Sequence, residues 1–467
     1  MRLRCRNEQG RLNSRLLESG VETIVGLPSL IEIIPLSGLG HVTLTIPGSK
    51  SITNRALILA ALGRGKTTLH GALWSEDTQV MTEALVALGF SVEVLSDLNE
   101  PSNRTIIVTG LGGRIPNGGT ATAPLELSVA NAGTAARFLS AVVCLGQGWY
   151  RLSGVDRMHE RPQASLFSAL RQLGYDVLGS GDHLPVTIRG RGPLSGRKTT
   201  VSLSESSQFA SALLLAASHG GWDIEVDGGG DADEAPYVEM TRQLIATFPR
   251  EGGDFVIEPD ASSASYFWAA GWLSGGRIRS ASENSSTSSF EIADWPNSGW
   301  QVDARFPGFL PLPSQVSRDH HLGDSILTAM VVAALGEDSR PVEFTDLSRL
   351  RVQECERVIA MRTELSRCGA DVTEVGDTLR IVSRPLHGAT LETYKDHRMA
   401  MCWATLGLKV PGIKIRDPRC VRKTFPNFFQ KLAAAPPHGL GASIWECDPT
   451  KGNRTRRLTE PSELFAH

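Results

Sequence analysis

A nine-residue pattern that occurs three times constrains the fold of this chain more than any other feature. Residues 84–92, 169–177 and 364–372 each combine an amphipathic helical stretch, a glycine and β-branched residues typical of a strand start. The first two copies are offset by 85 residues, from Leu88 to Leu173. Because this period exceeds that of common solenoids, the pattern predicts pseudo-symmetric α/β units reused within a domain.

Strand-like segments alternate with these helices at 105–109, 185–188, 223–226 and 378–382. The chain is therefore predicted to be α/β, with helices and short strands interleaved throughout. The pattern fades between 275 and 317, where serine and asparagine are frequent and four prolines interrupt any helix. We expect a degraded repeat or an inserted irregular loop there.

Length and charge narrow the class of protein. A chain of 467 residues can hold two or three domains. Because 47 basic residues nearly balance 50 acidic ones, neither nucleic acid nor a charged membrane is expected as a partner. Seven scattered cysteines without a CxxC pair favour a reducing, cytoplasmic compartment and no metal site. The longest apolar runs, near 211–218 and 326–335, are too short to span a bilayer.

Both ends of the chain look like extensions. The first 30 residues are rich in arginine, but Glu8 and Glu18 interrupt the charge and no apolar segment follows, so a disordered extension is favoured over a targeting peptide. Residues 437–467 are polar, aperiodic and contain glycine and proline. We expect them to form a loosely held tail.

The segment 47–55, Pro-Gly-Ser-Lys-Ser-Ile-Thr-Asn-Arg, predicts an anion site at a helix start. Unpaired N–H groups and the helix dipole favour negative charge there, and Lys50 adds a cation. Arg55 lies four residues after Ser51 and so shares part of its helix face. An ordinary capped helix with a solvated lysine is the alternative. By contrast, residues 65–68, Gly-Lys-Thr-Thr, only imitate a nucleotide-binding loop, since Ala60 stands where that motif needs glycine.

Further helix starts carry small residues or cations. Asn131 and Gly133 begin a helix that could let a ligand approach the backbone, or could simply pack. Ser206, Ser207 and Gln208 open an apolar helix and form either a phosphate cradle or an N-cap. The other basic residues near predicted helix starts are Arg157, Arg161, Arg398 and Lys423.

Few acid–base groups accompany these cations. Asp324 precedes an apolar helix and is either its N-cap or a base. Glu354 and Arg357 share a helix face, which by itself indicates a surface ion pair. His397 adds a titratable imidazole beside Arg398. Together these motifs predict one multiply anionic ligand site assembled between domains.

In order along the chain, these segments resemble the 5-enolpyruvylshikimate-3-phosphate synthase family. The resemblance extends over about residues 40–434 and includes Pro236-Tyr237 and the segments 260–267, 394–401 and 423–426. It implies two globular domains of three repeated βαβαββ units each, an inside-out α/β barrel arrangement with helices inside, sheets outside and a cleft between the domains. The implied first domain comprises 31–47 plus 259–436 and the second comprises 48–258, with crossings near Pro47 and Pro259.

The resemblance also implies the reaction: transfer of the enolpyruvyl group of phosphoenolpyruvate to the 5-hydroxyl of shikimate 3-phosphate, with release of phosphate. This is a step of the shikimate pathway of aromatic amino acid biosynthesis. It implies small-molecule substrates, no cofactor and a monomeric enzyme. Most of the rate would come from positioning two anionic substrates and stabilising charge.

Site residues follow from the resemblance position by position. The implied phosphoenolpyruvate ligands are Lys50, Asn131, Gly133, Arg161, Gln208, Arg357, Arg398 and Lys423. The implied shikimate 3-phosphate ligands are Lys50, Ser51, Arg55, Ser206, Ser207, Gln208, Tyr237, Asp324 and Gln353. Asp324 is the implied base for the hydroxyl proton, Glu354 and Lys50 are proton-transfer candidates, and His397 supports them.

Four positions depart from the family pattern. Gln353 stands where lysine is common, Glu234 replaces a serine that holds the shikimate phosphate, Arg349 replaces an asparagine, and Phe138 replaces a proline. Losing a lysine and gaining a carboxylate both weaken anion binding, whereas Arg349 restores charge. A paralogous transferase acting on another cyclitol acceptor is therefore the alternative function, and a non-catalytic binding protein of the same fold is less favoured.

Overall fold

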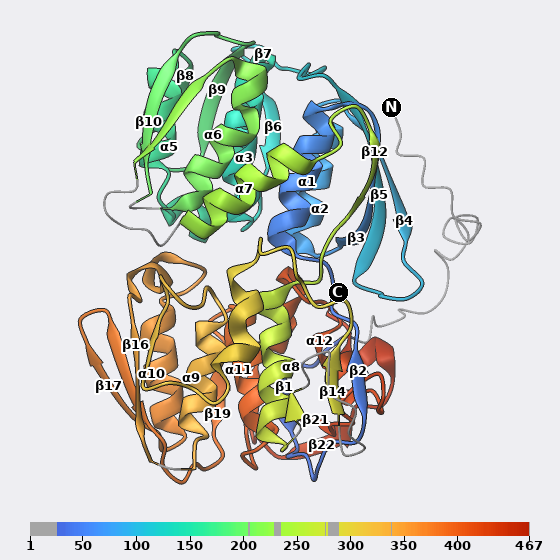
Figure 1. The fold of residues 1–467 in the computed structure, drawn as a ribbon, viewed down its shortest axis with the longest axis vertical. Coiled ribbons are helices and arrows are strands. Elements are labelled where there is room, and N and C mark those ends of the chain that lie inside the picture. Colours follow the sequence, from blue (N-terminus) through green and yellow to red (C-terminus); the bar gives the residue numbers. More distant parts are fainter. Residues whose placement is uncertain are drawn as a thin grey trace.

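The computed structural model describes residues 26–203, 206–227, 235–275, 277–278, 289–337 and 339–466. In these residues the chain forms two lobes, one above the other in Figure 1. The hydrophobic core of the upper lobe is built from residues between 52 and 257, and that of the lower lobe from residues 27–46 and 264–466. Of the expected N-terminal extension at 1–30, residues 1–25 lie outside the described residues.

The three copies of the repeated pattern build three four-stranded sheets with one topology. In each sheet the first two strands are parallel and the last two pairs are antiparallel. The first sheet is β12 (Gly253–Val256), β3 (Arg64–Leu73), β5 (Asn103–Leu111) and β4 (Ser91–Ser96). The second is β6 (Leu125–Ser128), β7 (Gln147–Ser153), β9 (Val186–Arg191) and β8 (Asp176–Leu178). The third, in the lower lobe, is β15 (Gln315–Ser317), β16 (Pro341–Thr345), β18 (Thr378–Val382) and β17 (Asp371–Val375).

A glycine ends the helix of each repeat in the same conformation. Helices α2 (Glu76–Ala87), α5 (Ala164–Gln172) and α10 (Arg357–Arg367) lead to glycines with φ of 97°, 98° and 98° at positions 89, 174 and 369. Only glycine adopts this left-handed region without strain. The repeat predicted from the sequence is therefore confirmed at the level of single backbone angles.

Three further sheets, of two, three and five strands, complete the described part of the chain. They are β10 (Lys198–Ser202) with β11 (Asp223–Asp227); β13 (Arg277–Ile278), β14 (Ser289–Ile292) and β2 (Val42–Leu44); and β19 (Thr390–Glu392), β20 (Lys414–Arg416), β1 (Leu30–Ile33), β21 (Ile444–Cys447) and β22 (Arg454–Arg457). Within the residues that the structure describes, each lobe thus has three sheets. The segment 275–317, expected to be irregular, contributes β14 and β15, while residues 276 and 279–288 lie outside the described residues.

Nearly fully buried helices fill the interior of each lobe. In the upper lobe these are α1 (Lys50–Leu62), α3 (Gly133–Val142) and α6 (Ser207–Gly220), and in the lower lobe α8 (Ala261–Leu273), α9 (Ile326–Ala334) and α11 (His397–Gly407). The other helices are α4 (Asp156–Glu160), α7 (Ala235–Thr247) and α12 (Phe428–Ala433). Short 3₁₀ turns are η1 (Val143–Leu145), η2 (Val302–Phe309), η3 (Ser348–Val352), η4 (Pro418–Lys423) and η5 (Pro461–Leu464). The predicted arrangement, helices inside and sheets outside, is confirmed (Figure 1).

The chain passes between the two cores at two adjacent points. Gly48 forms an antiparallel bridge with Pro259. The N–H of Ser49 donates to the Glu258 carbonyl at 2.7 Å, and that of Asp260 to the Pro47 carbonyl at 2.9 Å. Gly48 is required here, because a Cβ atom would lie 2.0 Å from the carbonyl oxygen of Gly71. This pairing fixes the start of α1 against the start of α8.

The expectation of a loosely held C-terminal tail is wrong. Strand β21 pairs with β1 in antiparallel register, and β22 extends the same sheet. Leu440, Ile444 and Leu464 are buried in the lower core. The strands were hidden in the sequence because each has only four residues and lies between glycine- and proline-containing turns.

Among the described residues, no helix combines the length and apolar character needed to cross a membrane.

Replacing Ile444 with alanine should destabilise the protein by about 2–5 kcal/mol, because the change opens a cavity at a fully buried strand position. Calorimetric melting would show this as a lower transition temperature. The matched control is Val375→Ala on β17, a side chain that is 73% exposed and should change stability by at most about 0.5 kcal/mol. Equal effects of the two changes would contradict the packing of the C-terminal strands.

Candidate active site

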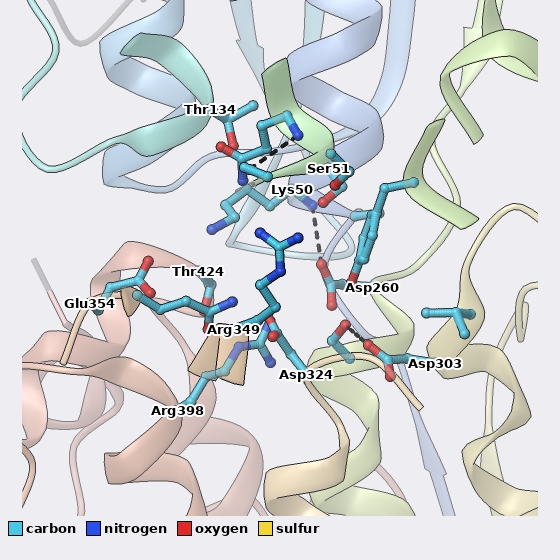
Figure 2. Close-up of a pocket in the computed structure, with 18 of the residues that line it drawn as sticks. Lys50, Ser51, Thr134, Asp260, Asp303, Asp324, Arg349, Glu354, Arg398 and Thr424 are labelled. Carbon is cyan, nitrogen blue, oxygen red and sulfur yellow. Dashed lines mark hydrogen bonds and ion pairs between the residues drawn. The ribbon is translucent and has the colours of Figure 1, made fainter. Parts of the chain in front are cut away.

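Helix starts from both lobes face one cleft. The first residues of α1 and α6 come from above, and those of α10 and α11, with Asp324 before α9, come from below. Figure 2 shows Lys50, Ser51 and Thr134 opposite Asp324, Glu354 and Arg398 across this space. Because unpaired N–H groups and helix dipoles favour anions at helix starts, the cleft is a strong anion site before any side chain is counted.

Most of the predicted site residues line this cleft. They are Lys50, Ser51, Arg55, Arg161, Ser206, Ser207, Gln208, Tyr237, Asp324, Gln353, Glu354, Arg357, His397 and Arg398. The other three lie just behind its wall. Lys423 donates to the carbonyl of Asn131 at 3.0 Å. At Gly133 a Cβ atom would lie 2.2 Å from a terminal nitrogen of Arg137 and 2.8 Å from those of Arg161, so glycine lets two guanidinium groups reach the backbone.

Asp324 is a largely buried carboxylate, 20% exposed, held between arginines. Its Oδ2 is 2.9 Å from Nη2 of Arg398, and its Oδ1 is 3.6 Å from Nη1 of Arg357. Burial raises the pKa of this group, but Arg398, Arg357 and Arg318 outweigh burial and lower the pKa to about 2. Asp324 is therefore ionised at neutral pH and able to accept a proton.

The alternative reading of Asp324 as a helix cap is wrong. Oδ1 of Asp303 accepts the N–H groups of Gly323 and Ser325 at 2.7 and 3.2 Å, and Ser325 is the N-cap of α9. Since Asp303 binds the backbone here, the carboxylate of Asp324 is left to face the cleft.

Glu354 forms two ion pairs inside the site. Its carboxylate is 2.9 Å from Nη2 of Arg357 and 3.1 Å from Nζ of Lys423. Burial would raise the pKa of Glu354, but the charges of Lys423, Arg357 and Arg161 together lower it well below its usual value. The pair of Glu354 and Arg357 is thus buried, not the surface pair that sequence spacing alone indicated.

The surroundings of His397 favour the neutral form of its imidazole. Burial and the nearby Arg398 lower its pKa well below 6.5, and Lys50 contributes in the same direction. Asp396, the residue before it, accepts from Nε of Arg357 at 2.7 Å and caps α11 through the N–H of Arg398 at 2.9 Å. His397 therefore lies among charges without carrying one.

The guanidinium of Arg55 is held by hydrogen bonds to neighbouring residues of the protein. Its guanidinium donates to Thr241 at 2.7 Å, to the carbonyl of Ser51 at 3.0 Å and to Ser211 at 3.0 Å. Burial lowers its pKa to about 10, which leaves it charged at neutral pH. Phe138, one of the unusual positions, lies under this guanidinium, 5.3 Å from ring centroid to Cζ. Arg55 joins α1, α6 and α7 and also borders the cleft.

Two of the unusual residues make contacts between the lobes. Arg349 donates to the carbonyl of Leu203, and in Figure 2 its side chain extends into the space between the lobes. The carbonyl of Gln353 accepts from Arg157 at 3.0 Å, and its side-chain oxygen accepts from Arg357. The fourth unusual residue, Glu234, lies outside the described residues.

Sequence reasoning missed several residues that line the cleft. They are Thr134, Arg137, Asp260, Asp303, Arg318 and Thr424. Arg137 lies in the predicted helix that begins at Asn131 and Gly133. Its position one turn after Gly133 could have identified it as a cleft residue. Nε and Nη1 of Arg137 are buried without a hydrogen-bond partner in the structure. By contrast, only tertiary folding brings Asp303 and Arg318 to this place.

Comparison with known proteins agrees with this geometry. A family model described as EPSP synthase (3-phosphoshikimate 1-carboxyvinyltransferase) matches residues 39–294 and 312–432. A 3-phosphoshikimate 1-carboxyvinyltransferase from Rhizobium etli is 38% identical over 83% of this chain and 93% of its own length. The enzyme of the same name from a Nostoc species is 37% identical over 84% of this chain and 95% of its own length.

The fold is also similar to solved structures. The EPSP synthase of Acinetobacter baumannii superposes with a TM-score of 0.64 over 89% of this chain and 100% of its own, at 21% sequence identity. This likeness concerns the fold, whereas the sequence relatives carry the family assignment. From the extent of the family match and the identity to its members, the chain belongs to the EPSP synthase family.

Proposed function

We propose that this protein is a 3-phosphoshikimate 1-carboxyvinyltransferase, which transfers the enolpyruvyl group of phosphoenolpyruvate to the 5-hydroxyl of shikimate 3-phosphate and releases phosphate. The observation that carries the proposal is one cleft in which cations from both lobes surround two ionised carboxylates, Asp324 and Glu354. Family membership supplies the reaction. The activity belongs to the shikimate pathway of aromatic amino acid biosynthesis.

The cations that surround Glu354 form the phosphoenolpyruvate subsite in this proposal. Its proposed ligands are Lys50, Asn131, Gly133, Arg161, Gln208, Arg357, Arg398 and Lys423. Lys423 and Arg357 now bind Glu354, and the anionic groups of phosphoenolpyruvate would compete with that carboxylate for them. When substrate anions also bind these cations, the cations stabilise the Glu354 carboxylate less. Burial then raises the pKa of Glu354, so that the protonated carboxyl can act as a proton donor.

The acceptor subsite lies next to the starts of α1 and α6. Its proposed ligands are Lys50, Ser51, Arg55, Ser206, Ser207, Gln208, Tyr237, Asp324 and Gln353. Hydroxyl and amide donors at these helix starts suit a phosphate group. Asp324, ionised between arginines, is positioned to accept the proton of the 5-hydroxyl.

The addition step needs one proton delivered and one removed. The acceptor oxygen attacks C2 of phosphoenolpyruvate while C3 gains a proton from Glu354 or Lys50, and Asp324 accepts the hydroxyl proton. The tetrahedral intermediate then returns a C3 proton to the group that supplied it and loses phosphate, which regenerates the double bond. Helix starts and arginines that already point into the cleft stabilise the developing charge without reorganisation.

For the domains, we propose boundaries of 27–47 plus 259–466 and of 48–258, which close on each other around substrate. The paired segments at Gly48 and Pro259 support a hinge there. We further propose a cytoplasmic monomer without a nucleic-acid partner. The near balance of charge and six free cysteines among the described residues support this.

The acceptor is the least constrained part of the proposal, because Gln353 removes a cation from the acceptor subsite. Phosphate release from phosphoenolpyruvate should therefore be measured with shikimate 3-phosphate and, separately, with shikimate. We expect turnover with the phosphorylated acceptor. A clear preference for shikimate would favour the paralogous transferase, and no turnover with either acceptor would overturn the enzyme assignment.

Lys50→Met should lower kcat/KM for phosphoenolpyruvate by about 10²–10³-fold, because it removes a cation that contacts the reacting anion. The protein should stay folded by circular dichroism. Lys66→Met on strand β3, an exposed lysine outside the cleft, is the control and should leave turnover unchanged. A fully active Lys50→Met enzyme would refute the role of this lysine.

Asp324→Asn should reduce kcat by at least about 10²-fold by removing the base. Since the pKa of Asp324 is lowered to about 2, its carboxylate stays ionised as pH falls from neutral and is protonated only near that value. The pH–rate profile of the unmodified enzyme should therefore show no acid limb from this group between about pH 5 and 8. An acid limb in that range that disappears in Asp324→Asn would contradict the assignment.

A further inference from the structure

The ammonium group of Lys50 lies at a helix start, where the helix dipole disfavours positive charge. Lys50 is the first residue of α1, and the positive end of the helix dipole lies there. Its side chain is only 16% exposed, and its charge is close enough to contribute to the lowered pKa of His397. A flexible ammonium in this position needs something to hold it against repulsion from the neighbouring arginines.

Two aspartates supply that support. Oδ2 of Asp260, the N-cap of α8, accepts the backbone N–H of Lys50 at 3.2 Å. Oδ2 of Asp77, in the first turn of α2, lies 3.1 Å from the Nζ atom of Lys50. One carboxylate thus fixes the backbone of the lysine and the other fixes its ammonium group.

Asp77 is placed for this task and not for substrate contact. It is 2% exposed and does not line the cleft. A buried carboxylate is costly unless it is paired, and Lys50 provides the pairing cation. At the start of α2 the N–H of Ser75 donates to Oγ1 of Thr78 at 2.9 Å, and the N–H of Thr78 donates to the carbonyl of Ser75 at 3.1 Å. The Asp77 side chain is therefore not needed as the N-cap.

We propose that Asp77 is a positioning residue that holds the ammonium of Lys50 at the phosphoenolpyruvate subsite. The inference rests on the proposed function, since it names a residue that acts through a proposed ligand of that substrate. Without the carboxylate, the lysine would sample other rotamers and its charge would be displaced by nearby guanidinium groups. The ammonium group of Lys50 would then lie at the phosphoenolpyruvate subsite, in the position needed for reaction, only part of the time.

The test compares Asp77→Asn with Glu83→Gln, an exposed acid on the same helix. Asp77→Asn should lower kcat/KM for phosphoenolpyruvate about tenfold to a hundredfold. Calorimetric binding of shikimate 3-phosphate should weaken less, because Lys50 is one of nine proposed ligands of that substrate. Glu83→Gln should match the unmodified enzyme in both. Asp77→Glu, which keeps the charge, should retain more activity than Asp77→Asn.

A double-variant cycle separates positioning from a general structural effect. If Asp77 acts through Lys50, residual phosphate release by the combined Asp77→Asn and Lys50→Met variant should equal that of Lys50→Met alone within about twofold. The inference would be overturned if the activity losses of the two single variants multiplied in the combined variant. It would also be overturned if Asp77→Asn were as active as Glu83→Gln, or if Asp77→Glu were no more active than Asp77→Asn. Absence of turnover in the unmodified enzyme would instead overturn the proposed function.

Discussion

Repulsion between cations is the constraint on which this site depends. Helix starts from two lobes bring Lys50, Arg161, Arg357, Arg398 and Lys423 to one partly buried space. Such a cluster is tolerated only if negative charge is interleaved with it. The structure meets this need with carboxylates from within the chain, each within a few ångströms of a cation.

These carboxylates have two roles. Asp324 and Glu354 compensate arginine and lysine charges in the cleft, and both are also the proposed proton-transfer groups. Substrate anions and internal carboxylates therefore compete for the same cations. Binding is weaker than the number of cations alone indicates, but binding and the protonation of Glu354 become coupled.

Sequence reasoning reached the parts of this molecule that are encoded locally. Helix starts at Lys50 and Gly133, and the glycine that ends each repeated helix, follow from capping chemistry and from glycine's freedom to adopt positive φ. The family resemblance supplied most cleft residues. What escaped is long-range: Asp303 binds the N–H groups of Gly323 and Ser325 just before α9, and Asp77 reaches Lys50 from another helix. The four-residue strand β21 also escaped, because a segment that short carries little periodicity.

The pairing of β1 with β20 and β21 has a consequence for how the protein is made. Strand β1 is synthesised early, yet its partners on both sides lie beyond residue 413. The upper lobe, by contrast, draws its core from the uninterrupted stretch between 52 and 257. On the ribosome the upper lobe can therefore fold while the first strand of the lower lobe still waits for its neighbours, and the exposed edge of that strand is a point at which a chaperone could protect the nascent chain.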